Sequence, residues 1–296
     1  MRPILRPRDP MRRSASLKVQ SYISLGLPGL GSRARKLGHI FLAGLGLALA
    51  AATPRPARAF GDVGAFDPRV LLTGSQTDAA RPDAPARWAV ELESRTSAPV
   101  RHRPLRVRAD EGALTDEPFA YWSGDKAVEP LTANEISGLR RFVSLGGVLF
   151  VDDAAPEASG AAGPFGRSVR TELARVLPDS TPIAIGSEHV IFRTFYLLRR
   201  AEGRILGART LDAIMRGGKA AVVLSEHDLG GALAKGVTGA WQFPVTPGGD
   251  AQRERAIRLA VNIAMYVLCS NYKDDQVHAQ SLMRRGIIVP SIRSDP

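Results

Sequence analysis

The chain has 296 residues, of which 40 are Lys or Arg and 29 are Asp or Glu, and its formal net charge is +11. Residues 1–59 hold 11 of the basic residues and one acid, which leaves 29 basic and 28 acidic residues in the remainder. Because that remainder is nearly neutral, it offers little neutralisation of phosphates, and the composition argues against a nucleic-acid-binding protein. The single cysteine, Cys269, excludes an intrachain disulfide.

Residues 1–59 have the pattern of a secretory leader. Basic residues up to Lys36 precede an apolar run at 40–52, and Ala57, Arg58 and Ala59 form a small-x-small cleavage site. The run is shorter than the ~20 apolar residues of a membrane span, which favours a cleaved leader over the alternative, an uncleaved N-terminal anchor. We therefore predict a periplasmic or secreted protein that contacts a membrane only if the leader is uncleaved.

Cleavage after Ala59 leaves 237 residues, enough for one α/β domain. We expect this domain at 60–270 and a C-terminal tail at 271–296. A first strand is expected at 69–74, and a helix at 84–97 with Trp88 and Leu92 on its buried face. A second strand is expected at 100–107, whose alternating arginines indicate a solvated face near neutralising acids rather than a row of phosphate ligands.

The clearest local signals lie in residues 119–153. A compact strand is expected at 119–122, and Thr132 with Glu135 fits a capping box at the start of the next helix. Gly146 and Gly147 end that helix, since glycine adopts left-handed backbone conformations without a side-chain clash. The four apolar residues at 148–151 then indicate a strand buried on both faces, and Asp152 and Asp153 close it.

The rest of the chain continues the alternation of strands and helices. Helices are expected at 168–176 and 251–269, and strands at 182–185 and 220–224. Residues 231–250 form a Gly-, Pro- and Trp-containing excursion, interpreted as a lid or an edge covering. Cys269 is expected to be a buried thiol at the end of the last helix's apolar stripe, and Asn262 to bind a core backbone group or to face the site.

Polar clusters follow several of the expected strands, at residues 123–125, 152–153 and 226–228, and residues 188–189 could join them from a loop. The carboxyl ends of parallel strands share one edge, where open α/β sheets bind ligands. One interpretation is a site for a divalent metal, with Asp153, His189, His227 and Asp228 as candidate ligands, although no compact metal motif is present. The favoured alternative is that these acids cap helices or hold loops through backbone N–H groups.

The sequence offers little support for a nucleophilic enzyme or a nucleotide-binding protein. Ser75, Ser123 and Ser225 follow strands, but none has the Gly-x-Ser-x-Gly setting of a hydrolase nucleophile. Neither the Gly44–Gly46 segment nor Gly217 and Gly218 lies in the context of a phosphate-binding loop. No cofactor is therefore predicted, and a divalent metal stays open.

Taken in order, these signals resemble the bacterial domain-of-unknown-function family 4159 over most of residues 68–270. The resemblance is carried by residues 119–122, 139–142, 146–153, 170–173, 188–189, 223–230, 261–263 and 266–268. It implies a flavodoxin-like or class I glutamine amidotransferase-like fold, a three-layer sandwich with a mostly parallel sheet, and no established activity. Motif matches carry over to Asp152, Asp153, His189, Asp228 and Asn262.

The resemblance also bears on function. True amidotransferases carry a cysteine where this chain has Asp152 and Asp153, so glutamine hydrolysis by their mechanism is not expected. Family members resemble components of exported or membrane-associated systems, which implies a protein partner in the cell envelope. We therefore expect a non-catalytic binding or assembly module. The alternative is a metal-assisted hydrolase using Asp152 or Asp153 and His189 as ligands or base, with Asp228 orienting the histidine.

Overall fold

The computed structural model describes the backbone of residues 64–284 and the side chains of residues 64–270. The expected leader lies outside these residues, and so does the end of the expected tail. Within the described part, no helix combines the length and the apolar composition needed to cross a membrane.

The centre of the domain is a seven-stranded sheet with the order β2-β1-β3-β4-β7-β6-β5. Neighbouring strands from β2 to β7 run parallel, whereas β6 is antiparallel to both of its neighbours. The strands are β1 (Val70–Leu72), β2 (Arg106–Arg108), β3 (Phe119–Gly124), β4 (Val148–Asp153), β5 (Ile183–Ile185), β6 (Leu211–Arg216) and β7 (Lys219–Ser225). The expected mostly parallel α/β sheet is confirmed.

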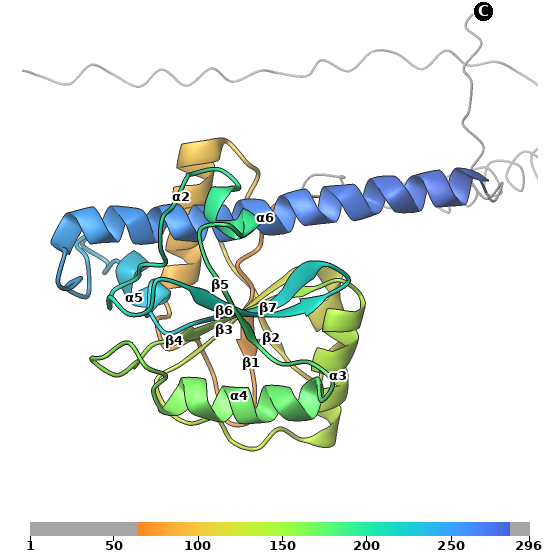
Figure 1. Ribbon diagram of the computed structural model, residues 1–296, viewed down its shortest axis with the longest axis horizontal. Helices are drawn as coiled ribbons and strands as arrows, with labels where there is room; N and C mark the ends of the chain where they lie inside the picture. Colours follow the sequence, from red (N-terminus) through yellow and green to blue (C-terminus); the bar gives the residue numbers. More distant parts are fainter. Residues whose placement is uncertain (1–63, 285–296) are drawn as a thin grey trace, which may run out of the picture. The chain divides into compact units, whose positions relative to one another are not determined.

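Helices cover both faces of the sheet, as Figure 1 shows, and so form the outer layers of a three-layer sandwich. One layer holds α2 (Ala84–Thr96), α5 (Leu229–Leu233) and α6 (Gly249–Arg284), and the other holds α3 (Ala133–Ser144) and α4 (Pro164–Val176). Two short 3-10 helices, η1 (Gly112–Asp116) and η2 (Val190–Arg193), lie in the connections.

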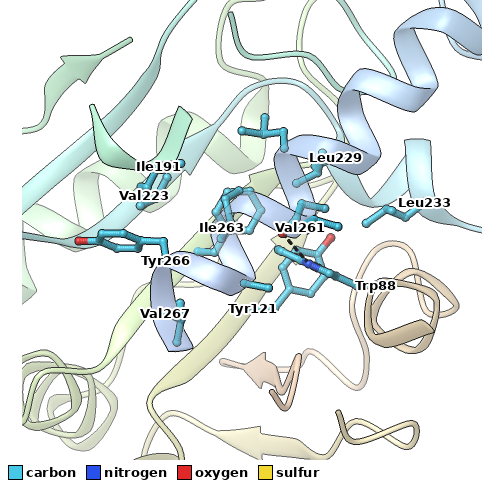
Figure 2. Close-up of a cluster of buried hydrophobic side chains, with 14 of the residues drawn as sticks. Trp88, Tyr121, Ile191, Val223, Leu229, Leu233, Val261, Ile263, Tyr266 and Val267 are labelled. Atoms are coloured by element: carbon cyan, nitrogen blue, oxygen red, sulfur yellow. Dashed lines mark hydrogen bonds between the residues drawn. The ribbon is translucent and has the colours of Figure 1, made fainter. Parts of the chain in front are cut away.

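Each layer buries its own hydrophobic cluster against the sheet. Trp88 of α2 packs edge-on against Tyr121 and Phe150 of the central strands, with ring centroids 5.8 and 5.6 Å away. The indole N–H of Trp88 donates to the carbonyl of Ala260 at 2.8 Å, which joins α2 to α6 (Figure 2). A buried tryptophan therefore satisfies its one donor while filling the space between two helices and the sheet.

The local signals around α3 and β4 are confirmed. Thr132 accepts from the backbone N–H of Glu135, and the Glu135 carboxylate accepts from the backbone N–H of Thr132 at 2.9 Å, so both halves of the capping box are present. Gly146 follows the helix with a φ of +91°, where glycine avoids a steric penalty. All six residues of β4 are buried, as an apolar strand between two helical layers requires.

Several sequence predictions need correction. The second strand is limited to β2, because Val100 makes only an isolated bridge to Phe66. Strand β6 was not predicted, and it forms an antiparallel hairpin with β7 through Gly217 and Gly218. The predicted burial of Cys269 is wrong, since this thiol is exposed.

The ends of two helices also differ from the prediction. Helix α4 begins at Pro164, four residues before the predicted start, because proline is tolerated in a helix's first turn. Helix α6 continues to Arg284, fifteen residues beyond its predicted end, and crosses the position where the tail was expected to begin. The apolar stripe that predicted this helix ends at Leu268, so it gave no signal for the continuation.

Candidate functional site

The carboxyl ends of the parallel strands bring three of the predicted polar clusters to one edge of the sheet. Ser123 is the register partner of Asp152, which in turn is the partner of Ser225, so the ends of β3, β4 and β7 lie side by side. The edge predicted from the sequence therefore exists, and the contacts of each side chain decide what it can do.

Asp152 is completely buried and ties β4 to the start of α5. Its Oδ1 accepts from the backbone N–H of Leu229 at 2.9 Å, and its Oδ2 accepts from that of Gly230 at 2.7 Å. The hydroxyl of Tyr121 also donates to Oδ2 at 3.0 Å. Both carboxylate oxygens are thus engaged within the fold.

Burial raises the pKa of Asp152 to about 7, and the nearby charge of Asp228 adds to this effect. The N–H groups of Gly230 and Leu229 and the Tyr121 hydroxyl act in the opposite direction, because they stabilise the carboxylate. Burial and the neighbouring Asp152 also raise the pKa of Tyr121. The pKa of Asp152 therefore suits a general acid or base, but its carboxyl group is buried within the fold.

Asp228 is also buried and lies between two arginines. Arg81 donates to it through two nitrogens, at 3.1 and 2.8 Å, and Arg204 forms a further hydrogen bond with Oδ2. Its Oδ1 accepts from the backbone N–H of Gly231 at 2.9 Å. The φ of +48° is a left-handed value that Asp and Asn tolerate better than most residues. Asp228 therefore fixes the turn after β7 and anchors two loops.

Asp153 binds the start of α4. Its Oδ2 accepts from the backbone N–H of Gly163 at 2.6 Å and of Gly166 at 3.3 Å, and its Oδ1 accepts from Ala155 N–H at 3.0 Å. The first N–H groups of a helix have no partner inside the helix and attract anions. A carboxylate from the preceding strand fills that position here. The capping role weighed for these acids agrees with their contacts.

The two histidines of the proposed metal set make contacts of their own rather than meeting the acids. His189 accepts from Ile191 N–H through Nδ1 and lines a shallow pocket with Lys219 and Tyr266, at the amino end of β7. Asp152 and Asp228 lie at the other end of that strand. Burial and the charge of Arg193 lower the pKa of His189. The Asp228 carboxylate binds arginines rather than this histidine.

His227 faces a neighbouring loop. Its Nδ1 lies 3.3 Å from the carbonyl of Ile205, and burial lowers its pKa. Among the residues that the structure describes, no group of three or more His, Cys, Asp or Glu side chains is arranged to hold a metal ion. Asn262, by contrast, binds the backbone of Tyr196 at 2.7 and 2.8 Å, which agrees with the structural role weighed for it.

A cleft of about 450 Å³ opens at the same edge, between the loops that follow β1 and β3. The chain leaves β1 toward β2 on one side and leaves β3 toward β4 on the other, so this is the point where the strand order reverses. Open α/β sheets characteristically bind ligands at such a switch point. The lining is polar, with Thr73, Ser75, Gln76, Thr77, Asp78, Ser123, Asp125, Lys126 and Glu129 among its residues.

Gln76 holds the two walls of the cleft together. Its Oε1 accepts from the indole N–H of Trp122 at 3.1 Å, and its Nε2 donates to the carbonyl of Ser123 at 3.3 Å. Asp78, at the outer side, accepts from Arg106 at 2.5 Å. The cleft is thus built from loops that are fixed to the sheet.

A family model described as Domain of unknown function (DUF4159) matches residues 68–268, more than half of the chain. The chain belongs to this family. The matched range includes all seven strands and therefore both the acid network and the cleft. No curated protein matches the chain.

Three residues of the DUF4159 domain with structural importance at this edge were missed by sequence reasoning. Arg81 and Arg204 hold Asp228, and Gln76 joins the cleft walls. None lies in a motif, because each sits in an irregular loop whose partner is distant in sequence. The only available signal is position: Gln76 and Arg81 follow β1, the strand at the switch point.

Proposed function

We propose that this protein is an exported, non-catalytic binding module whose ligand occupies the cleft between the loops after β1 and β3. The observation that carries the proposal is the coincidence of that cleft with the switch point of the sheet. Its volume lies within the range of pockets for small molecules, roughly 300 to 1,000 Å³. Export rests on the sequence of residues 1–59.

The chemistry of the cleft favours a small polar ligand. Its lining offers hydroxyl, amide, carboxylate and ammonium groups, which bind by hydrogen bonds and ion pairs. The phosphate sites that a doubly wound fold would otherwise offer at α4 and α5 are filled by Asp153 and Asp152. A ligand recognised mainly through phosphate at these two helices is therefore disfavoured.

The alternative is a metal-assisted hydrolase at the same edge. It draws on the raised pKa of Asp152, since perturbed pKa values gather at catalytic sites. Against it, both oxygens of Asp152 are occupied by Leu229, Gly230 and Tyr121, and the side chain is buried. A catalyst would have to open the β4–α5 connection to reach that carboxyl.

The binding proposal is tested by ligand-observed NMR of the full-length chain with a library of small polar metabolites. Ala127 is exposed and lines the cleft, so Ala127→Trp fills the cleft from its surface without entering the core. Ala208→Trp, at another exposed loop position, is the matched control. We expect hits that Ala127→Trp abolishes and Ala208→Trp retains.

Two outcomes contradict the proposal. Hits that persist in Ala127→Trp place the ligand elsewhere. Hits that are converted to product, with a rate that Asp152→Asn abolishes while the protein stays folded, support the hydrolase instead.

A further inference from the structure

Exposed apolar side chains gather in one short segment of the chain. Of the eight large apolar residues that are exposed in the described part, three lie in residues 190–197. Leu197 is 87% exposed, Val190 48% and Phe195 44%. Single exposed apolar residues are ordinary on protein surfaces, but a group of them marks an interaction site. We call residues 193–200 the Leu197 loop.

The fold holds this loop in place. Asn262 of α6 is fully buried, and its Oδ1 accepts from the backbone N–H groups of Phe195 at 3.3 Å and Tyr196 at 2.7 Å. Its Nδ2 donates to the carbonyl of Tyr196 at 2.8 Å, and the N–H of Leu198 donates to the carbonyl of Phe192 at 2.8 Å. The exposure of Leu197 is thus imposed by an anchored backbone.

Arginines lie within this loop and beside it. Arg193 and Arg199 are exposed within the loop, and the guanidinium of Arg258, also exposed, lies 5.1 Å from the ring centre of Tyr196. Acids are present as well: Glu188 lies 3.8 Å from Arg193, and Glu254 pairs with Arg258 at 2.8 Å. Residues 188–200 still hold three arginines against one acid.

We propose that the Leu197 loop docks on an anionic lipid surface, with Phe195 and Leu197 at the level of the acyl chains and the arginines at the headgroups. Apolar side chains beside basic residues are the combination that binds such interfaces. A stable protein partner would need roughly 800 Å² on this side and a matching pocket for Leu197. A bilayer needs neither. This contact does not depend on an uncleaved leader or on the cleft.

The test uses the full-length chain, with Cys269→Ser removing its only cysteine. Leu197→Cys then carries an environment-sensitive fluorophore, and vesicles of phosphatidylcholine are compared with vesicles that also contain phosphatidylglycerol. Val237→Cys is the matched control, because Val237 is 109% exposed on a different loop. Lipids brominated on their acyl chains report depth by quenching, so a leader that also binds the vesicle does not mask the result.

We expect a blue shift and quenching for the probe at 197, only with the anionic vesicles and weakened by salt, and no response at 237. Arg199→Gln should lower the partition coefficient about fivefold, the effect of one basic residue near an anionic surface. Equal responses at 197 and 237, or none at 197, overturn the proposal. A blue shift of the probe at 197 that grows with protein concentration in the absence of lipid also overturns the proposal, since a second copy of the chain then covers the loop.

Discussion

The pKa of Asp152 predicts how the stability of the fold changes with pH. Its usual value of 3.8 is raised to about 7, so between these values the folded protein keeps a proton that the unfolded chain releases. The stability contributed by this group is therefore fully present below about pH 4 and is lost as pH rises toward about pH 7. A shift of about three pH units corresponds to at most about 4 kcal/mol.

Asp152→Asn removes this titration. The variant also loses stability at every pH, because an amide nitrogen would face the N–H of Gly230 or Leu229. That loss is the same at every pH. The difference in free energy of unfolding between wild type and variant should fall by as much as about 4 kcal/mol between about pH 4 and about pH 8. The measurement is urea unfolding followed by tryptophan fluorescence across this range.

Two further variants should move the pH at the midpoint of this stability change in opposite directions. Asp228→Asn removes a neighbouring negative charge and should lower the pKa of Asp152. Tyr121→Phe removes a hydroxyl that stabilises the carboxylate and should raise it. A difference between wild type and Asp152→Asn that stays constant over the whole pH range would refute this reasoning, and so would midpoints that move together.

Other substitutions test the network and its packing by urea unfolding. Asp228→Ala should cost about 3 to 5 kcal/mol, because it leaves two arginines without their carboxylate and puts alanine at a φ of +48°. Asp228→Asn should cost less, and an equal loss would contradict this account. Asp153→Ala should cost about 2 kcal/mol by uncapping α4, and no loss would show that the cap contributes nothing. Gly138→Ala would put a Cβ 1.9 Å from the carbonyl oxygen of Ala109 and should cost about 3 kcal/mol. Gly112→Ala meets nothing within 4 Å and should change stability by about 0.5 kcal/mol at most, so equal effects at the two glycines would contradict the packing argument.

Local patterns predicted the parallel half of this fold well. The capping box at Thr132, the glycines after α3 and the unbroken apolar run of β4 each depend on neighbours in sequence. The hairpin of β6 and β7 was missed although Gly217 and Gly218 have the positive φ values of a tight hairpin turn. Met215 is half-buried and Arg216 is exposed at the end of β6, and Asp212 interrupts its apolar residues, so β6 lacks the unbroken apolar run that marked β4.

The site was harder to predict than the fold because its geometry depends on long-range partners. The sequence placed Asp152, Asp153 and Asp228 at the correct edge. Their partners could not be predicted, because Asp228 binds an arginine 147 residues away, and Asp152 and Asp153 accept from backbone N–H groups in other parts of the chain. His189 was grouped with these acids because its loop could reach the same edge, and the sequence carried no sign that this loop returns to the amino end of β7. The residue types predicted that this edge of the sheet is polar, but only the folded chain shows which of these side chains lie close enough to interact.

The acids at the edge also explain why a familiar architecture need not carry a familiar reaction. In doubly wound folds, a helix that begins after a strand presents free N–H groups to an anionic ligand. Asp152 and Asp153 occupy those groups at α5 and α4, with distances of 2.7 and 2.6 Å at the shortest contacts. An anion that displaced them would leave buried carboxylates without hydrogen-bond partners. The free-energy cost of that exceeds what a weakly bound anion would contribute. The loops after β1 and β3 are not closed by such a carboxylate from β4, and the cleft lies there, so this is the part of the edge where a ligand can enter without dismantling the fold.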